Sequence, residues 1–167
     1  RNYCKRRNEN RNSRKLMIKS NQNIAIQQFL PHRQPMLFVD TIILIETNYV
    51  EAIYTIKSGQ LFLQNDYFSE IGLIENMAQV CSSIIGQKYF IDDNLQKGDV
   101  IGYISTIKTC TIYNLPKINQ TILTKAKLLE VFDYEDYAIS TMETQVLIDD
   151  KVYATATLNL LLQNHKR

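Results

Sequence analysis

The chain has 167 residues, of which 45% are hydrophobic, so it can bury one sizeable core and does not require a second. Its formal net charge of +2 is unevenly spread, because residues 1–15 hold seven of the 19 basic side chains and one of the 17 acidic ones, which leaves 12 basic against 16 acidic side chains. No apolar run approaches the ~20 residues that span a bilayer, and no apolar core follows the N-terminal charges, so neither a membrane segment nor a signal peptide is expected.

Residues 1–16 are mostly Arg, Asn, Lys and Ser and lack apolar periodicity. We expect a disordered basic tail, one that could be artefactual because Met17 stands just before the patterned part of the chain. Such a tail can bind nucleic acid or anionic lipid, but the simpler interpretation is an unstructured extension, so no nucleic acid and no membrane is expected as a partner. Residues 17–163 are expected to form a single domain, followed by a polar tail over 164–167.

The cysteines, Cys4, Cys81 and Cys110, are odd in number and lack metal-type spacing. Cys81 falls in an apolar helical pattern typical of a buried thiol. A reducing, cytoplasmic setting fits this usage best. No cluster of His, Cys and carboxylates indicates a metal site, and no glycine-rich phosphate loop is present, so neither a metal nor an organic cofactor is expected.

The patterned part of the chain opens with a predicted short helix over residues 24–29, capped by Asn23 and ended by Pro31, which would act as a lid or plug. Residues 36–45 and 49–56 are rich in β-branched and aromatic side chains and are separated by a polar break, which predicts a hairpin. Residues 58–70 carry no clean period.

A long helix is predicted next, because apolar side chains recur at i, i+3, i+4, i+7, i+10 and i+11. Ser69 would cap it, and the composition becomes polar after Lys88, so the helix should end near Phe90. Gly72 would allow a close approach near the first turn. The apolar positions are Ile74, Met77, Ala78, Cys81, Ile84 and Ile85.

Four strands are then predicted, over residues 100–113, 120–132, 137–148 and 151–162, with a tight turn at 149–151. The order has no βαβ alternation, which makes this an α+β chain. A helix so rich in apolar residues, followed by a meander, favours the hot-dog arrangement, a curved antiparallel sheet wrapped around a long central helix. The edge strand of such a sheet favours at least a dimer.

Glu75 does not fit the core pattern, because apolar residues precede and follow it in the helix. A carboxyl group in an apolar pocket can both take and give a proton. The alternative is that Glu75 faces solvent or an interface and pairs with Gln79 one turn later. On the first reading, Glu75 would be an acid, and backbone N–H groups of Gly72 and Leu73, at the positive end of the helix, would form an oxyanion site.

His32 is the second candidate, because it is the one histidine within the patterned domain and lies between Pro31 and Pro35, which stiffen the backbone. It would be the base in a proton transfer. The alternative is a structural histidine that bonds nearby carbonyls. The sequence leaves both readings open.

Two stretches resemble the FabZ and FabA class of 3-hydroxyacyl-acyl-carrier-protein dehydratases, and within it the ApeP-like branch associated with aryl polyene and flexirubin-type pigments. Residues 30–40, Leu-Pro-His-Arg-Gln-Pro-Met-Leu-Phe-Val-Asp, are similar to the family's Pro-His-x-x-Pro opening, and residues 72–79, Gly-Leu-Ile-Glu-Asn-Met-Ala-Gln, to its Glu-x-Met-Ala-Gln helix. The resemblance covers about residues 24–162. It implies a lyase of fatty acid or polyene biosynthesis with Glu75 as a catalytic residue and Gln79 near the mouth of an acyl tunnel.

One departure concerns the His-Phe-Pro-Gly-His turn in which such enzymes carry their catalytic histidine. Here residues 62–69 read Phe-Leu-Gln-Asn-Asp-Tyr-Phe-Ser and contain no histidine. Three accounts remain: His32 replaces it, Asp66 or Tyr67 does, or the chain is an inactive partner of a complete dehydratase.

The resemblance implies acyl carrier protein as a partner, and either a homodimer or a heterodimer with another hot-dog dehydratase. A hot-dog thioesterase is the nearest rival, because the same helix can present a carboxylate that activates water. A non-catalytic subunit of a heteromeric dehydratase is the other alternative.

Overall fold

The structure is a computed structural model that describes residues 24–25, 30–86, 100–134 and 137–164. Its elements in chain order are β1 (Ile24–Ala25), β2 (Thr41–Glu46), β3 (Tyr49–Thr55), β4 (Leu63–Gln64), β5 (Tyr67–Phe68), α1 (Glu70–Gly86), β6 (Val100–Ile112), β7 (Thr121–Asp133), β8 (Tyr137–Ile148) and β9 (Lys151–Asn164).

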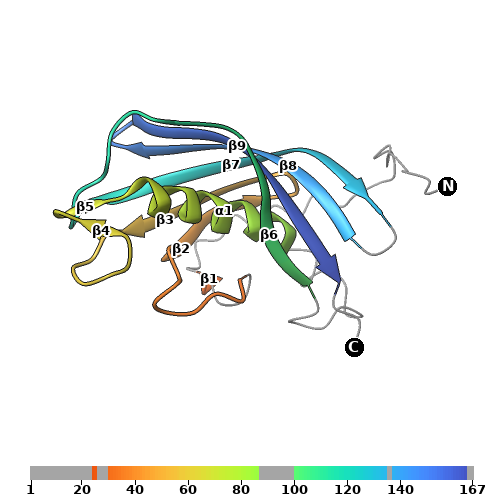
Figure 1. Ribbon diagram of the computed structural model, residues 1–167, viewed down its shortest axis with the longest axis horizontal. Coiled ribbons are helices and arrows are strands. Elements are labelled where there is room, and N and C mark those ends of the chain that lie inside the picture. The colour runs from red at the N-terminus through yellow and green to blue at the C-terminus, as the bar shows by residue number, and fades with distance from the viewer. Residues whose placement is uncertain (1–23, 26–29, 87–99, 135–136, 165–167) are drawn as a thin grey trace.

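Seven of the strands form one antiparallel sheet in the order β1-β2-β3-β7-β8-β9-β6. The sheet bends around α1, which lies against one face (Figure 1) and packs on β3, β6, β7, β8 and β9. β4 and β5 pair separately. The predicted α+β hot-dog fold is therefore confirmed, with β6, the strand that follows α1, at one edge of the sheet.

The core lies between α1 and the sheet. The apolar spacing of the helix is confirmed, because all but Ile74 of its predicted apolar positions are buried. Burying a large apolar side chain stabilises a fold by about 1.5–3 kcal/mol, so this seam holds the helix in place. Its largest fully buried side chains include Phe38, Phe68, Leu73, Met77, Ile122, Met142, Leu158 and Leu160.

The tight turn between β8 and β9 forms without glycine, as predicted. Asp149 and Asp150 both have positive φ angles, of 47° and 62°. Aspartate is one of the few non-glycine residues that tolerates this region, and two such residues in succession match the right-handed twist of a hairpin. Asn65 and Asp66 connect β4 to β5 in the same way, with φ angles of 49° and 64°.

Two predictions for the first part of the domain are wrong. Ile24 and Ala25 are not helical but pair with Ile42 and Thr41, because a free strand edge satisfies their backbone groups and a helix of six residues is marginal. The strand expected from residue 36 begins only at Thr41. The unpatterned stretch after residue 58 contains the β4–β5 hairpin, whose strands are too short to show a period.

Other predictions lie outside the described residues: the tail over 1–16, the rest of the short helix over 26–29, the end of the long helix near Phe90 and the last three residues of the C-terminal tail. Asn164, which we assigned to that tail, is the last residue of β9. No helix in the described part of the chain combines the length and the apolar character needed to cross a membrane.

Candidate functional site

His32 and Glu75 meet beside α1, although they come from distant parts of the sequence. Glu75 lies in the second turn of the helix, and His32 lies in the segment of residues 30–40, which contains neither helix nor strand. The Nε2 atom of His32 is 3.8 Å from Oε1 of Glu75, and their side chains are 27% and 26% exposed. Both groups are thus partly shielded and partly open to a ligand.

Glu75 is oriented by Gln79, one turn further along α1. The Nε2 atom of Gln79 donates a hydrogen bond of 2.8 Å to Oε1 of Glu75. This pairing with Gln79 was expected if Glu75 faced solvent or an interface and had no catalytic role. The carboxyl group nevertheless borders a cavity and is mostly shielded, so the pairing fixes its direction, and Oε2 has no hydrogen-bond partner among the residues that the structure describes.

His32 is held in an environment that disfavours its charged form. Burial lowers the pKa of His32, the Glu75 carboxylate opposes that change, and the Arg33 charge adds to it. Its Nδ1 atom is enclosed and has no hydrogen-bond partner in the described part of the chain. The imidazole is therefore neutral near pH 7, with Nε2 as the nitrogen nearest to Glu75.

Arg33 closes the turn that carries His32. Its Nη1 atom lies 3.1, 3.2 and 2.8 Å from the carbonyl oxygens of Leu30, Pro31 and His32. One guanidinium thus donates hydrogen bonds to three consecutive backbone carbonyls. This arrangement places a positive charge close to the imidazole without contacting its ring nitrogens.

A cavity of about 360 Å³ lies beside the two groups, between α1 and the β6 and β9 strands. Its helix wall includes two small side chains, Ala78 and Ser82, and its sheet wall includes Gly102, so room remains for a ligand. The residues that line it are His32, Glu75, Ala78, Gln79, Ser82, Gly102, Tyr103, Ile104 and Leu160.

The structure does not bring Gly72 and Leu73 to this cavity. Leu73 is fully buried, and its N–H donates to the carbonyl oxygen of Ser69 at 3.0 Å, so it is not a free donor for an oxyanion. Gly72 instead accommodates an aromatic ring, because a Cβ atom there would lie 2.4 Å from the ring of Phe68. The glycine fits a packing role.

Asp66 and Tyr67 also lie apart from the cavity. Both are exposed, in the β4–β5 hairpin, and neither lines the space beside Glu75. The ring of Tyr67 packs under Lys117, whose Nζ is 5.1 Å from the ring centroid. Of the three candidates for the missing histidine, His32 is the one that approaches Glu75 in this chain.

Two buried polar residues near the site did not stand out in the sequence, Asn76 and Thr124. Asn76 is 1% exposed and Thr124 is fully buried. Thr124 donates to Oδ1 of Asn76 at 2.6 Å, and Nδ2 of Asn76 donates to the carbonyl oxygen of Phe38, also at 2.6 Å. The signal was available, since Asn76 and Gln79 are two amides three positions apart in an apolar helix and so share a face.

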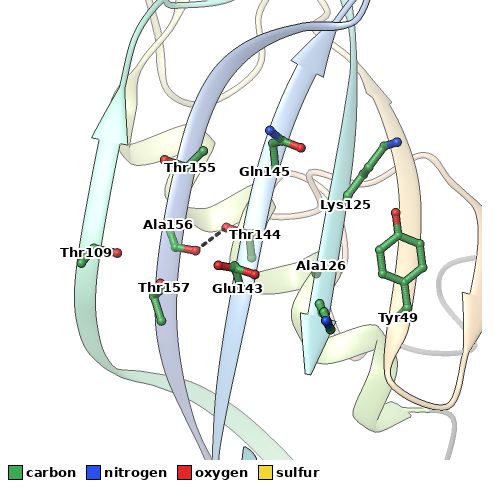
Figure 2. Close-up of a pocket in the computed structure, with 11 residues that line it drawn as sticks. Tyr49, Thr109, Lys125, Ala126, Glu143, Thr144, Gln145, Thr155, Ala156 and Thr157 are labelled. Carbon is green, nitrogen blue, oxygen red and sulfur yellow. Dashed lines mark hydrogen bonds between the residues drawn. The ribbon is translucent and has the colours of Figure 1, made fainter. Parts of the chain in front are cut away.

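A larger hollow, of about 510 Å³, lies elsewhere, across β3, β7, β8, β9 and β6 (Figure 2). It is lined by polar side chains from several strands, including Lys125, Lys127, Glu143 and Thr157. Glu51 forms an ion pair with Lys125 at 3.4 Å, so charge there is at least partly neutralised. The smaller cavity is the better candidate, because it joins a carboxyl group to an imidazole.

Proton transfer is the chemistry that this pair can perform. A separation of 3.8 Å exceeds hydrogen-bond length but allows adjacent atoms of one substrate to lie about 3 Å from each group. A neutral imidazole accepts a proton, and a carboxyl group gives one. The geometry suits a reaction that removes one proton and delivers another on neighbouring atoms.

Comparison with known proteins agrees with this picture. A family model described as "ApeP-like: ApeP dehydratase" matches residues 24–166. The chain is 26% identical over 144 residues to a 3-hydroxyacyl-[acyl-carrier-protein] dehydratase FabZ from Dichelobacter nodosus, covering 80% of this chain and 90% of that protein.

Two solved structures share its fold. One is the dehydratase heterocomplex ApeI:P from Xenorhabdus doucetiae, with a TM-score of 0.74, 18% identity and coverage of 86% of this chain and 93% of that one. The other is a sigma28-regulated virulence protein from Campylobacter jejuni, with a TM-score of 0.61, 14% identity and coverage of 84% and 90%. The resemblance read from the motifs is confirmed: the chain belongs to the ApeP-like family of dehydratases.

Proposed function

We propose that the chain dehydrates a 3-hydroxyacyl thioester presented by acyl carrier protein, with His32 and Glu75 as the proton-transfer groups. The observation that carries this proposal is the approach of His32 Nε2 to Glu75 Oε1, 3.8 Å apart beside one cavity. Membership of the ApeP-like dehydratases and similarity to a FabZ enzyme point to the same reaction.

In the proposed reaction, His32 removes the proton on the carbon next to the thioester carbonyl. Glu75 delivers a proton to the hydroxyl group on the following carbon. The C–O bond breaks, a carbon–carbon double bond forms, and water leaves. The lowered pKa of His32, caused mainly by burial, supports its role as base, because the imidazole is then unprotonated near neutral pH.

A partner subunit fits against the edge strand β6. Within the described residues, β6 pairs only with β9, and its Tyr103 and Ile107 are 49% and 44% exposed. Residues 102–104 of this strand also border the cavity, so a neighbouring chain would lie beside the site. The ApeI:P structure is of a heterocomplex, which supports a homodimer or a heterodimer with another hot-dog dehydratase.

The test is to incubate the protein with a 3-hydroxyacyl-carrier protein and to follow the products by mass spectrometry. Dehydration yields an enoyl thioester that is lighter by one water. Release of a free acid without enoyl product would identify a thioesterase instead. No reaction by the chain alone, but dehydration when a complete hot-dog dehydratase is added, would indicate a subunit of a heteromeric enzyme.

A further inference from the structure

Two side-chain amides of α1 hold the backbone of residues 36–38, which precedes β2. The N–H of Phe38 donates to Oε1 of Gln79 at 2.9 Å, and the carbonyl of Phe38 accepts from Asn76 at 2.6 Å. The carbonyl of Met36 accepts from Nε2 of Gln79 at 2.8 Å. Side chains here take the place that a neighbouring strand would have in a sheet.

The amide of Gln79 has no N–H left for a substrate. Its nitrogen carries two N–H groups, and it donates both to Met36 and to Glu75, each at 2.8 Å. Its oxygen accepts from Phe38, and the side chain is only 1% exposed. Although Gln79 borders the cavity, these contacts argue against the substrate-binding role that the resemblance implied.

Asn76 is fixed from its other side. Its Oδ1 accepts from Thr124 on β7, in addition to the bond from Nδ2 to Phe38. Because all three partners are buried, each bond is shielded from competing water. The chain of bonds therefore links the sheet, the helix and the segment that carries His32.

The same two amides thus determine where both reacting groups lie. Gln79 binds the Glu75 carboxyl directly, and it binds Met36, four residues after His32. We propose that Asn76 and Gln79 are positioning residues that set the separation of His32 and Glu75, an inference that rests on the proposed function. A displacement of about 1 Å costs a reaction of this kind about 100-fold in rate.

The first test is Gln79→Glu, which keeps the shape and replaces the amide nitrogen, with both of its N–H donors, by an oxygen. The added carboxylate charge favours the protonated form of His32, the proposed base, so we expect the acidic limb of the pH–rate profile to move to higher pH. We expect kcat to fall at least ~10-fold with KM changed less than ~2-fold, because an interaction that orients a catalytic group is lost. The control is Gln145→Glu, because Gln145 lines the larger hollow across the sheet and the variant adds the same charge away from the site. It should change neither the pH–rate profile nor kcat.

A rise in KM at constant kcat in Gln79→Glu would instead make Gln79 a substrate-binding residue and would overturn the proposal. An unchanged pH–rate profile and an unchanged kcat in a folded variant would overturn it as well.

The second test needs no substrate, so it separates this inference from the proposed function. Asn76→Leu is neutral, similar in size and removes both bonds. We expect the His32 ring, followed by NMR, to titrate at a lower pH than in the unmodified chain, because the segment that carries His32 moves away from Glu75 and the opposing effect of Glu75 weakens. Thr124→Val removes only the hydrogen bond from Thr124 to Asn76 and is the substitute variant if Asn76→Leu does not fold. It should lower the pH at which His32 titrates by a smaller amount. An unchanged His32 titration in the folded variant would overturn the proposal even if dehydration had been demonstrated.

Discussion

Glu75 Oε1 accepts a hydrogen bond from Gln79 and lies 3.8 Å from Nε2 of His32, so the imidazole and the carboxyl group are close but not bonded to each other. A direct bond would have to be broken before either group could reach a substrate. The observed gap leaves both groups free to engage neighbouring atoms of one ligand.

Glu75→Gln should abolish most dehydration while leaving the fold intact. The amide keeps the size of the side chain but cannot deliver a proton, and general acid catalysis contributes about 100- to 10,000-fold. The rate of enoyl formation, measured by mass spectrometry, should therefore decrease by a factor in that range. Glu70→Gln, an exposed carboxyl in the first turn of the same helix, is the matched control and should retain activity. Full activity of a complex that contains Glu75→Gln would show that the chain is a non-catalytic subunit.

The titration of His32 should respond to its charged neighbour. Its pKa is lowered mainly by burial, and the Glu75 carboxylate partly offsets this. In Glu75→Gln the offset is lost, so NMR should show the His32 ring titrating at a still lower pH. The same titration in Glu70→Gln should match that of the unmodified chain. A rise in the midpoint in Glu75→Gln would contradict the assigned environment.

Stability should decrease in mild acid because of the same histidine. The pKa of His32 is lower in the folded chain than in the unfolded chain, so the unfolded state binds more protons as the pH falls. The stability of the chain with an uncharged, buried His32 is fully present above the unfolded pKa of about 6.5, and part of it is lost as the pH falls through the pKa of the folded chain. Urea unfolding at about pH 7.5 and about pH 5.5 should therefore show a smaller loss of stability in His32→Asn than in the unmodified chain. Equal losses in both chains would exclude His32 as the source.

Gly72→Ala tests the packing of Phe68. The added Cβ would lie 2.4 Å from the ring of Phe68, which is fully buried. The centroid of this ring is 5.8 Å from the ring centroids of Phe38 and of Tyr54. Overpacking costs about 1–3 kcal/mol, more than the ~1 kcal/mol that alanine adds to a helix. Urea unfolding should show a net loss of stability. The loss should be smaller when Gly72→Ala is made in a Phe68→Leu background, and additivity of the two changes would argue against the clash.

Ile107→Glu tests the edge of the sheet as an interface. The side chain is 44% exposed on β6, where a partner would pair. A charge buried between subunits is costly, so the mass measured by light scattering should fall to that of one chain. Leu129→Glu is the matched control, since Leu129 is 46% exposed on β7, a strand inside the sheet. Equal masses for Ile107→Glu and the unmodified chain would place the interface elsewhere.

The long elements could be predicted because their patterns are long. The helix repeats apolar residues over three turns, and β9 alternates over ten residues, so local periodicity is enough. The strand at Ile24–Ala25 could not be predicted, because two residues show no period and their conformation is decided by pairing with β2. Tertiary pairing outweighed the local preference there.

Two residues that line the candidate cavity, His32 and Glu75, could be singled out from the sequence, but their arrangement could not be predicted. His32 and Glu75 each stood out, His32 by its place between two prolines and Glu75 by its apolar surroundings. Their separation depends on how residues 36–38 lie along α1, which Asn76 and Gln79 determine through bonds between distant parts of the chain. The bond of Thr124 to Asn76 depends likewise on where β7 passes the helix, which no local pattern records.

The segment that carries His32 has a thermal consequence. Residues 31–36 have no helix or strand of their own and are mostly exposed, whereas the sheet has seven strands. Parts of a protein secured by few backbone contacts open at lower free energy than its core. On gradual warming, the chain should lose turnover while its far-UV circular dichroism is still that of the intact sheet, and cooling should restore the turnover.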